Sequence, residues 1–385
     1  MVKTTTEPET IETAADAAVA DETAPAPPKA VGLMSGGLDS TLAARLLKDQ
    51  GVDVVGLYFN TGFCTYDHRR AIGRKNEDPR RLRNHALQAG AAAQVEIRVI
   101  DVADEYLEMV KNPKHGYGNA ANPCIDCRIF MLGKAREIAD QEGAEIIFTG
   151  EVLGQRPMSQ HMDSLKLIER ETELKGRLLR PLSARRLSAT VAEREGRVDR
   201  EQLLDIKGRS RREQEDLADT MGIDEYPQPS GGCCFLADRN FGERFHDLLT
   251  EEKTWGRRVG RDEIMMLKVG RHFRLSPLVK AIVGRDEGEN HFLERFRADR
   301  WRLAAVSDVG PVTLVTGSPD DGQIMTAASL TARYGDGRDR ETVEVKAERF
   351  GAADPGIPEV PAETRMLTAS PAVAAEDLAR LRVGI

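Results

Sequence analysis

From residue 30 to residue 150, short apolar runs alternate with stretches whose apolar positions recur at helical spacing. The apolar runs, which are typical of buried strands, cover 30–34, 52–59, 95–101 and 144–150. The helical stretches between them cover 38–51, 79–90 and 124–142. Because strands that alternate with helices form parallel sheets, the pattern predicts a doubly wound α/β sheet with its ligand site at the carboxyl ends of the strands.

The pattern changes twice in the rest of the chain. From 151 to 232 the alternation fades into Arg-rich turns and one helical stretch at 210–222, which we expect to lie partly on the sheet. From about 233, strand-like runs (EIMMLKVG, VKAIVG, VTLVTGS, ETVEVKA) and a charged helix, DEGENHFLERFRA, predict a second α+β domain of mixed pairing. The predicted divisions are a disordered acidic leader at 1–29, an α/β domain at 30–165, a middle segment at 166–240, a C-terminal α+β domain at 241–350 and a tail at 351–385.

Charge and cysteine content narrow the chemistry. The net charge of −8 would disfavour a nucleic-acid partner, but acidic residues gather in the leader, and basic stretches at 67–83, 177–186 and 253–274 leave a polyanion possible. The 385-residue chain has five cysteines, and it has neither a secretory signal pattern nor an apolar run long enough to span a membrane. We therefore expect a cytoplasmic protein with metal, cluster or sulfur chemistry rather than a disulfide framework.

The segment VGLMSGGLDS places glycines and serines between the first strand and the first helix. The backbone amides from Ser35 to Ser40, with the helix dipole behind them, would form a cradle for an anion. A tight turn without a ligand is the alternative. The segment lacks the lysine of a Walker A loop, which makes transfer of a γ-phosphoryl group the less favoured chemistry.

The SGG-x-DS pattern resembles the pyrophosphatase loop (PP-loop) of ATP-dependent adenylating enzymes with the HUP-type α/β fold. The resemblance implies that ATP is attacked at its α-phosphate, with Asp39 near Mg²⁺ and in a catalytic role. It also implies that the second strand contacts adenine and that Gly150 borders the ribose or the α-phosphate. The ATP-binding residues that it predicts are Ser35, Gly36, Gly37, Asp39, Ser40, Leu57, Phe59 and Gly150.

The segment NPCIDCRIFMLGKA places two cysteines at the start of a helix. Asn122 is expected as the N-cap and Pro123 as the first helical residue, so that Cys124 and Cys127 project from the first turn. Their position favours thiolates, which serve as nucleophiles or metal ligands. A zinc knuckle, a redox pair and simple burial are alternatives for this pair.

Two further cysteines, Cys233 and Cys234, lie far along the chain in PSGGCCFLADRNF. A third thiolate added to Cys124 and Cys127 would hold a [4Fe–4S] cluster with one iron open to a sulfur species, with zinc as the alternative. The third ligand would be Cys233 or Cys234. Cys64 is expected to be a buried or incidental thiol.

These segments resemble the tRNA 2-thiouridylases, which have one cysteine in an Asn-Pro-x-x-x-Cys segment and another before a phenylalanine downstream. Cys127 and Cys234 match these positions and are implied to be catalytic, carrying sulfur as a persulfide. The additional Cys124 and Cys233 match the iron–sulfur-dependent thiolation enzymes instead. The resemblance therefore supports sulfur transfer, by a cluster or by a persulfide.

Several polar segments are candidates for contact with RNA. The loop 149–161 follows the fourth strand, and Glu151, Gln155, Arg156 and Ser159 in it could meet ATP or the target base. The segment KVGRHFRLSPLVKAIVGRDEGENHFL resembles the RNA-binding domain at the C-terminus of ribosome quality-control factors, and a structural domain with ordinary surface arginines is the alternative. The RNA-binding residues predicted in this segment are Arg271 and Arg285, and His272, Arg274, Lys280 and Asn290 share its pattern. In LLRPLSARRLSAT, Arg180, Arg185 and Arg186 are predicted to bind RNA phosphates, with a solvated surface as the alternative.

Together these features predict an ATP-dependent tRNA uridine thiolase. Its expected partners are ATP, Mg²⁺, tRNA and a sulfur donor that is either sulfide or a persulfide carrier, with no membrane, and the chain could form a homodimer. A sulfur insertase acting on a small molecule and a non-catalytic RNA-binding factor are the alternative functions.

Overall fold

A parallel sheet forms the centre of the first domain. The computed structural model describes residues 26–72, 84–226, 234–352 and 360–384. Its first sheet has the strand order β3-β2-β1-β4-β5, and its neighbouring strands pair in parallel. These strands are β1 (Lys29–Leu33), β2 (Asp53–Asn60), β3 (Glu96–Asp101), β4 (Ile146–Thr149) and β5 (Leu178–Leu179). The doubly wound α/β fold predicted from the alternation is confirmed.

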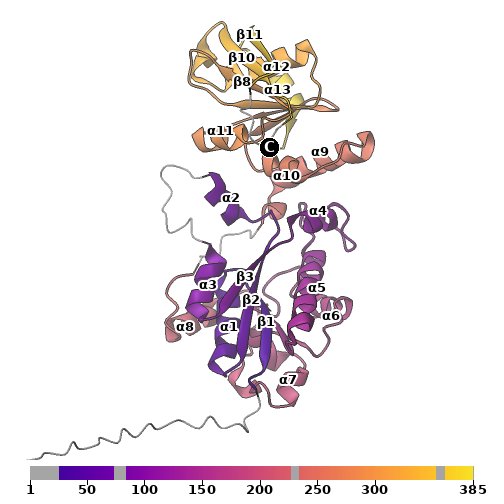
Figure 1. Cartoon of the computed structure of the whole chain (residues 1–385), viewed down its shortest axis with the longest axis vertical. Helices are drawn as coiled ribbons and strands as arrows, with labels where there is room; N and C mark the ends of the chain where they lie inside the picture. The colour runs from indigo at the N-terminus through magenta and orange to yellow at the C-terminus, as the bar shows by residue number, and fades with distance from the viewer. Residues whose placement is uncertain (1–25, 73–83, 227–233, 353–359, 385) are drawn as a thin grey trace, which may run out of the picture.

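Helices cover both faces of this sheet (Figure 1). On one face, α1 (Leu38–Asp49) contacts α3 (His85–Ala93) and α8 (Arg212–Thr220). On the other face, α5 (Cys124–Glu142) contacts α4 (Ala103–Lys111) and α6 (Met162–Glu171). Each face has its own apolar core. The stretch predicted as a helix at 79–90 is described only from residue 84 onward, where α3 follows its N-cap Asn84.

The middle segment packs on the parallel sheet, as expected for part of it, and the division placed at residue 166 stays a prediction. β5 pairs with β4, and the segment continues through a 3₁₀ turn (Pro181–Arg186) and α7 (Val191–Arg194). Leu182 and Leu203 of this segment share one apolar core with Leu42 of α1. The segment shows no clear periodicity because single leucines in turns, rather than the faces of regular elements, supply its buried surface.

The second domain is built on a wholly antiparallel sheet, and the expected mixed pairing is wrong. The strand order is β11-β10-β8-β9-β7-β6-β12. The strands are β6 (Arg271–Ser276), β7 (Val279–Val283), β8 (Trp301–Ala305), β9 (Thr313–Thr316), β10 (Val343–Arg349), β11 (Glu363–Ala369) and β12 (Arg382–Val383). Helix α12 (Asp321–Arg333) packs on this sheet, and α11 (Glu287–Glu294) follows β7. The predicted C-terminal α+β domain is thus present.

Two segments of the second half differ from expectation. EIMMLKVG is not a strand, because α10 (Arg261–Leu267) runs through it and begins where Gly260 donates its amide to the Glu263 carboxylate, 3.1 Å away. The predicted tail carries the two edge strands of the sheet, β11 and β12, and the helix α13 (Ala375–Leu381) between them. β11 pairs with β10 along its whole length, so its stability comes from that pairing rather than from its own composition.

The carboxyl ends of the parallel strands face the second domain (Figure 1). Helix α2 (Thr65–Ile72), which follows β2, contacts α11, and Asp101 at the end of β3 pairs with Arg261 of α10 at 2.6 Å. Buried His68 on α2 lies between the rings of Phe235 and Phe292, with centroid distances of 5.0 and 5.2 Å. Among the described residues, no helix has the length and apolar composition needed to cross a membrane.

Candidate nucleotide and sulfur site

The turn between β1 and α1 forms an open cradle of backbone amides. Gly36 adopts a φ of +79°, and a side chain there would approach the backbone of His85 to 2.6 Å, so only glycine fits. Gly37 is the N-cap of α1, and no side chain within the described structure caps it. The first amides of α1 therefore point outward with the positive end of the helix dipole, as an anion site requires.

Hydrogen bonds within the loop and from two distant segments hold three of its side chains, Ser35, Asp39 and Ser40, in place. The Ser40 hydroxyl donates to the Gly37 carbonyl at 2.8 Å and lies 3.4 Å from the Ser35 hydroxyl. The Asp39 carboxylate accepts from Gln155 at 3.0 Å and from Arg211 at 3.4 Å. An oriented carboxylate beside a phosphate cradle suits Mg²⁺, which prefers oxygen ligands and commonly bridges a carboxylate and phosphates.

The end of β4 lies directly against this loop. A side chain at Gly150 would come within 2.4 Å of the Asp39 carbonyl carbon and the Ser40 amide nitrogen, so the close approach depends on glycine. The contact of Gly150 with the nucleotide, which the resemblance to the PP-loop enzymes implies, stays a prediction. Leu57 and Phe59 on β2 instead have buried side chains within the apolar core, a placement that does not favour the predicted contact with adenine.

The loop after β4 contributes two kinds of residue. Gln155 reaches Asp39, whereas Glu151 is buried and pairs with Arg180 at 3.1 Å and with Arg128 at 3.3 Å. Arg180, only 2% exposed, also donates to Glu169. The predicted contact of Arg180 with RNA is therefore corrected, because its guanidinium is inside the protein and serves to hold Glu151. Ser159 is buried and Arg156 is exposed.

The start of α5 presents two half-buried thiols. The helix begins at Cys124 with Pro123 as its N-cap residue, one position later than expected. The displaced Asn122 donates its side-chain amide to the Cys124 sulfur at 3.3 Å. Buried Asp126 accepts from the backbone amides of Lys114 and His115, both at 3.0 Å, and so fixes the loop in front of the helix.

The downstream cysteine segment is inserted between the first domain's own loops. The amide of Phe235 donates to the carbonyl of Phe63 at 3.0 Å, and the amide of Ala121 donates to the carbonyl of Leu236, also at 3.0 Å. Phe63 follows β2, and Ala121 precedes α5. Cys127 and Cys234 both lie against the same apolar core. The predicted convergence of the two distant cysteine segments is thus present at the carboxyl end of the sheet.

Cys64, expected only as a buried or incidental thiol, lies next to the downstream cysteine segment, a neighbour that the sequence did not predict. It forms an antiparallel backbone bridge with Cys234, so the two residues lie opposite one another. Tyr58 and Asp67, joined by a 2.5 Å hydrogen bond, lie beside it. Burial raises the pKa of the Cys64 thiol. Burial also raises the pKa of the Tyr58 hydroxyl, and the charge of the nearby Cys64 adds to that shift. The sequence signal for this position is that Cys64 follows β2, whose carboxyl end lies at the ligand-binding edge of the sheet.

The described residues alone do not make up a cluster or zinc site. Among residues 26–72, 84–226, 234–352 and 360–384, no three histidine, cysteine or acidic side chains are grouped as metal ligands. Cys124 instead accepts a hydrogen bond from Asn122, and Cys234 lies opposite Cys64. The remaining ligand candidate, Cys233, lies outside the described residues.

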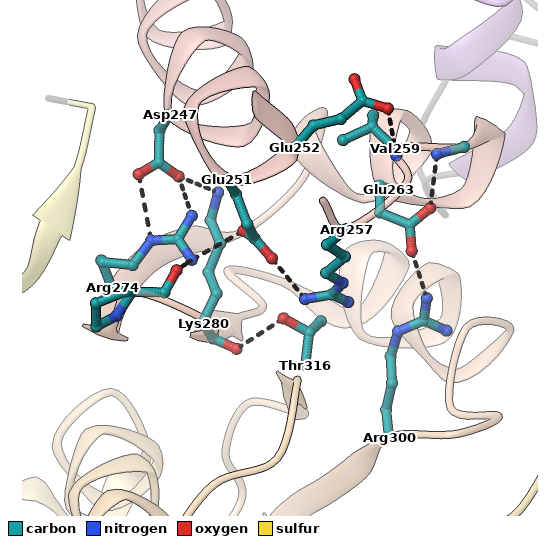
Figure 2. A network of polar contacts seen from close by, with 12 residues as sticks. Asp247, Glu251, Glu252, Arg257, Val259, Glu263, Arg274, Lys280, Arg300 and Thr316 are labelled. Carbon is teal, nitrogen blue, oxygen red and sulfur yellow. Dashed lines mark hydrogen bonds and ion pairs between the residues drawn. The ribbon is translucent and has the colours of Figure 1, made fainter. Parts of the chain in front are cut away.

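The predicted RNA-binding arginines are placed in different surroundings. Arg185 and Arg186 lie at the surface and pair with Asp205 at 3.6 and 3.1 Å, and their contact with RNA stays a prediction. Arg271 and Arg285 line a cavity between the two domains. The residues that share their pattern are structural: Arg274 and Lys280 pair with Asp247 of α9 (Arg239–Trp255), as Figure 2 shows, and His272 is fully buried.

Two parts of the chain match known families. Residues 26–187 match the family described as thiamine biosynthesis protein (ThiI). Residues 270–364 match the family described as the NFACT protein RNA binding domain. The first match contains the phosphate loop, Cys64 and α5, and the second contains most of the antiparallel sheet.

Individual relatives resemble the first part. The tRNA-specific 2-thiouridylase MnmA of Petrotoga mobilis is 32% identical over 134 residues, which cover 32% of this chain and 35% of that protein. The probable tRNA sulfurtransferase of Thermococcus kodakarensis is 28% identical over 178 residues, which cover 46% of this chain and 39% of that protein. The chain thus spans about a third of the length of the first relatives it matches. A predicted subunit of a tRNA methyltransferase from Methanocaldococcus jannaschii is a similar solved structure, with a TM-score of 0.31, 16% identity, and coverage of 50% of this chain and 76% of that one.

Proposed function

We propose, from the premise that residues 26–187 are a ThiI-type PP-loop domain and residues 270–364 an NFACT-type RNA-binding domain, that this protein is an ATP-dependent tRNA sulfurtransferase. It would adenylate a uridine and replace the uridine's carbonyl oxygen with sulfur. The observation that carries the proposal is the convergence of the phosphate loop and the cysteine segments of Cys64, Cys127 and Cys234 at one edge of the sheet.

In the activation step, the uridine carbonyl oxygen would attack the α-phosphate of ATP and release pyrophosphate. The amides of the loop from Ser35 to Ser40 would hold the departing pyrophosphate, since a preformed set of donors stabilises developing negative charge without rearrangement. Asp39 would hold Mg²⁺, which neutralises phosphate charge, while Gln155 and Arg211 keep the Asp39 carboxylate in place.

In the sulfur step, a persulfide carrier would first transfer its outer sulfur to the Cys234 thiolate and leave as a thiol. The terminal sulfur of the resulting persulfide would attack the activated carbon, and AMP would leave with the former carbonyl oxygen. A second cysteine thiolate would then attack the Cys234 sulfur. This breaks the sulfur–sulfur bond, leaves one sulfur on the base and forms a protein disulfide, which a thiol reductant restores. Cys127 matches the relatives' pattern for this role, and Cys64, which lies opposite Cys234, is the second candidate. No step is assigned to an iron–sulfur cluster, because the described thiols do not form a ligand group.

The test is mass analysis of tRNA nucleosides from cells that lack the protein and from cells that express a variant. We expect one thionucleoside to disappear on deletion, to return with the wild-type protein and to stay absent with Cys234→Ala or Asp39→Asn. A thionucleoside profile that deletion leaves unchanged would remove the proposal. Anaerobic purification with an iron count tests the sulfur route, and one cluster per chain that Cys124→Ala abolishes would replace the persulfide route by a cluster.

A further inference from the structure

A cavity of about 390 Å³ lies at the joint between the two domains. Its wall comes from the start of α9, the end of α10, β6, the turn after β7, and β12. One acidic side chain, Asp238, lines it, and this carboxylate is already engaged as the N-cap of α9, accepting from Phe241 at 2.8 Å. Five cationic side chains line the same cavity: Arg244, Lys268, Arg271, Arg285 and Arg382.

Arg244 indicates that the cavity is built for an anion. Its side chain is 8% exposed and donates one hydrogen bond, from Nη1 to the Leu267 carbonyl at 3.0 Å. Its Nε has no hydrogen-bond partner among the described residues. Burying a guanidinium charge without a counter-charge is costly, and because Arg244 lines the cavity, an anion bound there would offset that cost.

The other cations are arranged so that positive charge remains in the cavity. Arg285 pairs with buried Glu289 at 2.6 Å, which offsets one of the five charges. Arg271 stacks over the Tyr334 ring, 4.4 Å from its centroid, an arrangement that leaves the guanidinium charge uncompensated. Arg382 on β12 is exposed and forms no ion pair within the described part of the chain.

Salt bridges fix the elements that form the wall. Asp247 of α9 pairs with Arg274 of β6 at 2.5 Å and with Lys280 of β7 at 3.0 Å (Figure 2). Glu251, one turn further along α9, pairs with Arg274 at 2.9 Å and with Arg257 at 2.7 Å. The helix that carries Arg244 is therefore attached to the sheet that carries Arg271, and a preorganised site loses less conformational entropy on binding.

We propose that this cavity binds one backbone phosphate of the RNA substrate and thereby holds the RNA next to the cysteine site. The identification of the bound RNA as the tRNA substrate rests on the proposed function. Phe235 and Lys268 line the cavity, and both touch the loop that carries Cys64: Phe235 donates its amide to Phe63, and Lys268 donates to the Gly62 carbonyl. Arginine forks suit a phosphodiester, which offers two free oxygens.

The residues that form this cavity come from both inside and outside the part that matches the RNA-binding family. Arg271 and Arg285 lie within the part that matches the RNA-binding family, whereas Arg244, Lys268 and Arg382 lie outside it. A second cavity of about 330 Å³ shares Phe235, Lys268 and Arg285 with the first and extends to α2. The basic surface thus continues toward the helix that follows Cys64.

The test measures tRNA affinity of the full chain over a range of salt concentrations. We expect the double variant Arg271→Gln, Arg382→Gln to bind tRNA about tenfold more weakly at one fixed salt concentration. The slope of log affinity against log salt should fall by about one, the change expected for the loss of one phosphate contact. The matched control is Arg338→Gln, Arg380→Gln, since these side chains are each 71% exposed, lie in the same domain and do not line the cavity.

The outcomes separate this proposal from others. An unchanged salt slope in the double variant, with its melting temperature preserved, overturns it. Millimolar inorganic phosphate that raises the melting temperature of the wild type but not of the variant, with tRNA binding equal in both, also overturns it in favour of a small-anion site. A changed slope supports it even if deletion leaves tRNA nucleosides unaltered, a result that would remove only the proposed function.

Discussion

Cys64 and Cys234 lie opposite one another in an antiparallel backbone bridge. The hydrogen bond from the Phe235 amide to the Phe63 carbonyl identifies the bridge as the closely spaced, non-hydrogen-bonded kind. In such pairs the Cα atoms are about 4.5 Å apart and the side chains leave the backbone on the same face. The fold therefore places a thiol from the end of β2 beside the downstream cysteine, where the relatives' pattern predicts only Cys127.

Mild oxidation should join Cys64 to Cys234. Their spacing falls within the Cα range of about 4.4–6.8 Å that disulfides occupy. Peptide mapping by mass spectrometry without reductant should recover the cross-linked pair after treatment with a thiol oxidant. Cys64→Ser should abolish it and Cys124→Ser should leave it intact. Recovery of only a Cys127–Cys234 cross-link would contradict the expectation and restore the family's pairing.

Gly150→Ala should disable the phosphate loop. The added carbon would lie 2.4 Å from the backbone of Asp39 and Ser40, so the loop must shift. A displacement of about 1 Å in a positioned catalytic group costs about 100-fold in rate. The measurement is pyrophosphate release with ATP and tRNA. Gly133→Ala is the matched control, because nothing lies within 4 Å of the added carbon, and in helix α5 it should stabilise the protein by roughly 1 kcal/mol. Equal rates for both variants would argue against the loop's role.

Arg180→Met should destabilise the protein rather than weaken RNA binding selectively. Removing the guanidinium leaves the buried Glu151 carboxylate without one of its cationic partners, and breaking a buried pair costs about 3–5 kcal/mol. Thermal unfolding of this variant should therefore occur at a clearly lower temperature. Arg185→Met, which removes a surface residue 40% exposed, should change stability by less than about 0.5 kcal/mol. A loss of RNA affinity in Arg180→Met at an unchanged melting temperature would reinstate the RNA contact.

Binding of RNA should weaken as the pH rises through about 8. Burial lowers the pKa of Lys268 to about 8, although the nearby Cys64 and Asp67 oppose this shift and Arg261 adds to it. Arg244, whose pKa is lowered to about 10, stays charged in this range. Lys268 thus loses its charge in the free protein between about pH 7 and 9, and the cavity loses one cation. Titration of tRNA affinity against pH should detect this.

The Lys268→Arg variant should flatten that pH profile, and a profile equally steep in both proteins would exclude Lys268 as its source. The free energy of unfolding should change with pH in the opposite direction to the affinity for RNA. Between about pH 8 and the ordinary lysine pKa of 10.5, the unfolded chain holds a proton that the folded chain does not, so the free energy of unfolding should rise with pH.

Local patterns in the sequence were enough to predict the parts of the site that are built from contiguous residues. The SGGLDS loop follows a strand and opens a helix, and α5 begins at Cys124, because turn and capping chemistry act over a few residues. The apolar run in EIMMLKVG was misassigned because a short run fits a strand or one face of a helix equally well. Arg180 was misassigned because an arginine in a turn carries no local sign of burial.

The missed features depend on residues that only the fold brings together. Cys64 has no motif around it, and its relation to Cys234 arises from a backbone bridge between distant segments. The basic cavity takes Arg244 from a helix, Lys268 from a turn and Arg382 from the last strand. No spacing rule along the chain connects such positions, and the net charge of −8 conceals them.

The edge-on packing of His68 against both Phe235 and Phe292 has a consequence for how the molecule unfolds. His68 belongs to α2 of the first domain, Phe235 to the connecting segment and Phe292 to α11 of the second domain. Separating the domains would expose these three aromatic faces to water, so the two halves should melt cooperatively as a single folding unit. A fragment cut between them would lose part of its own core together with its neighbour.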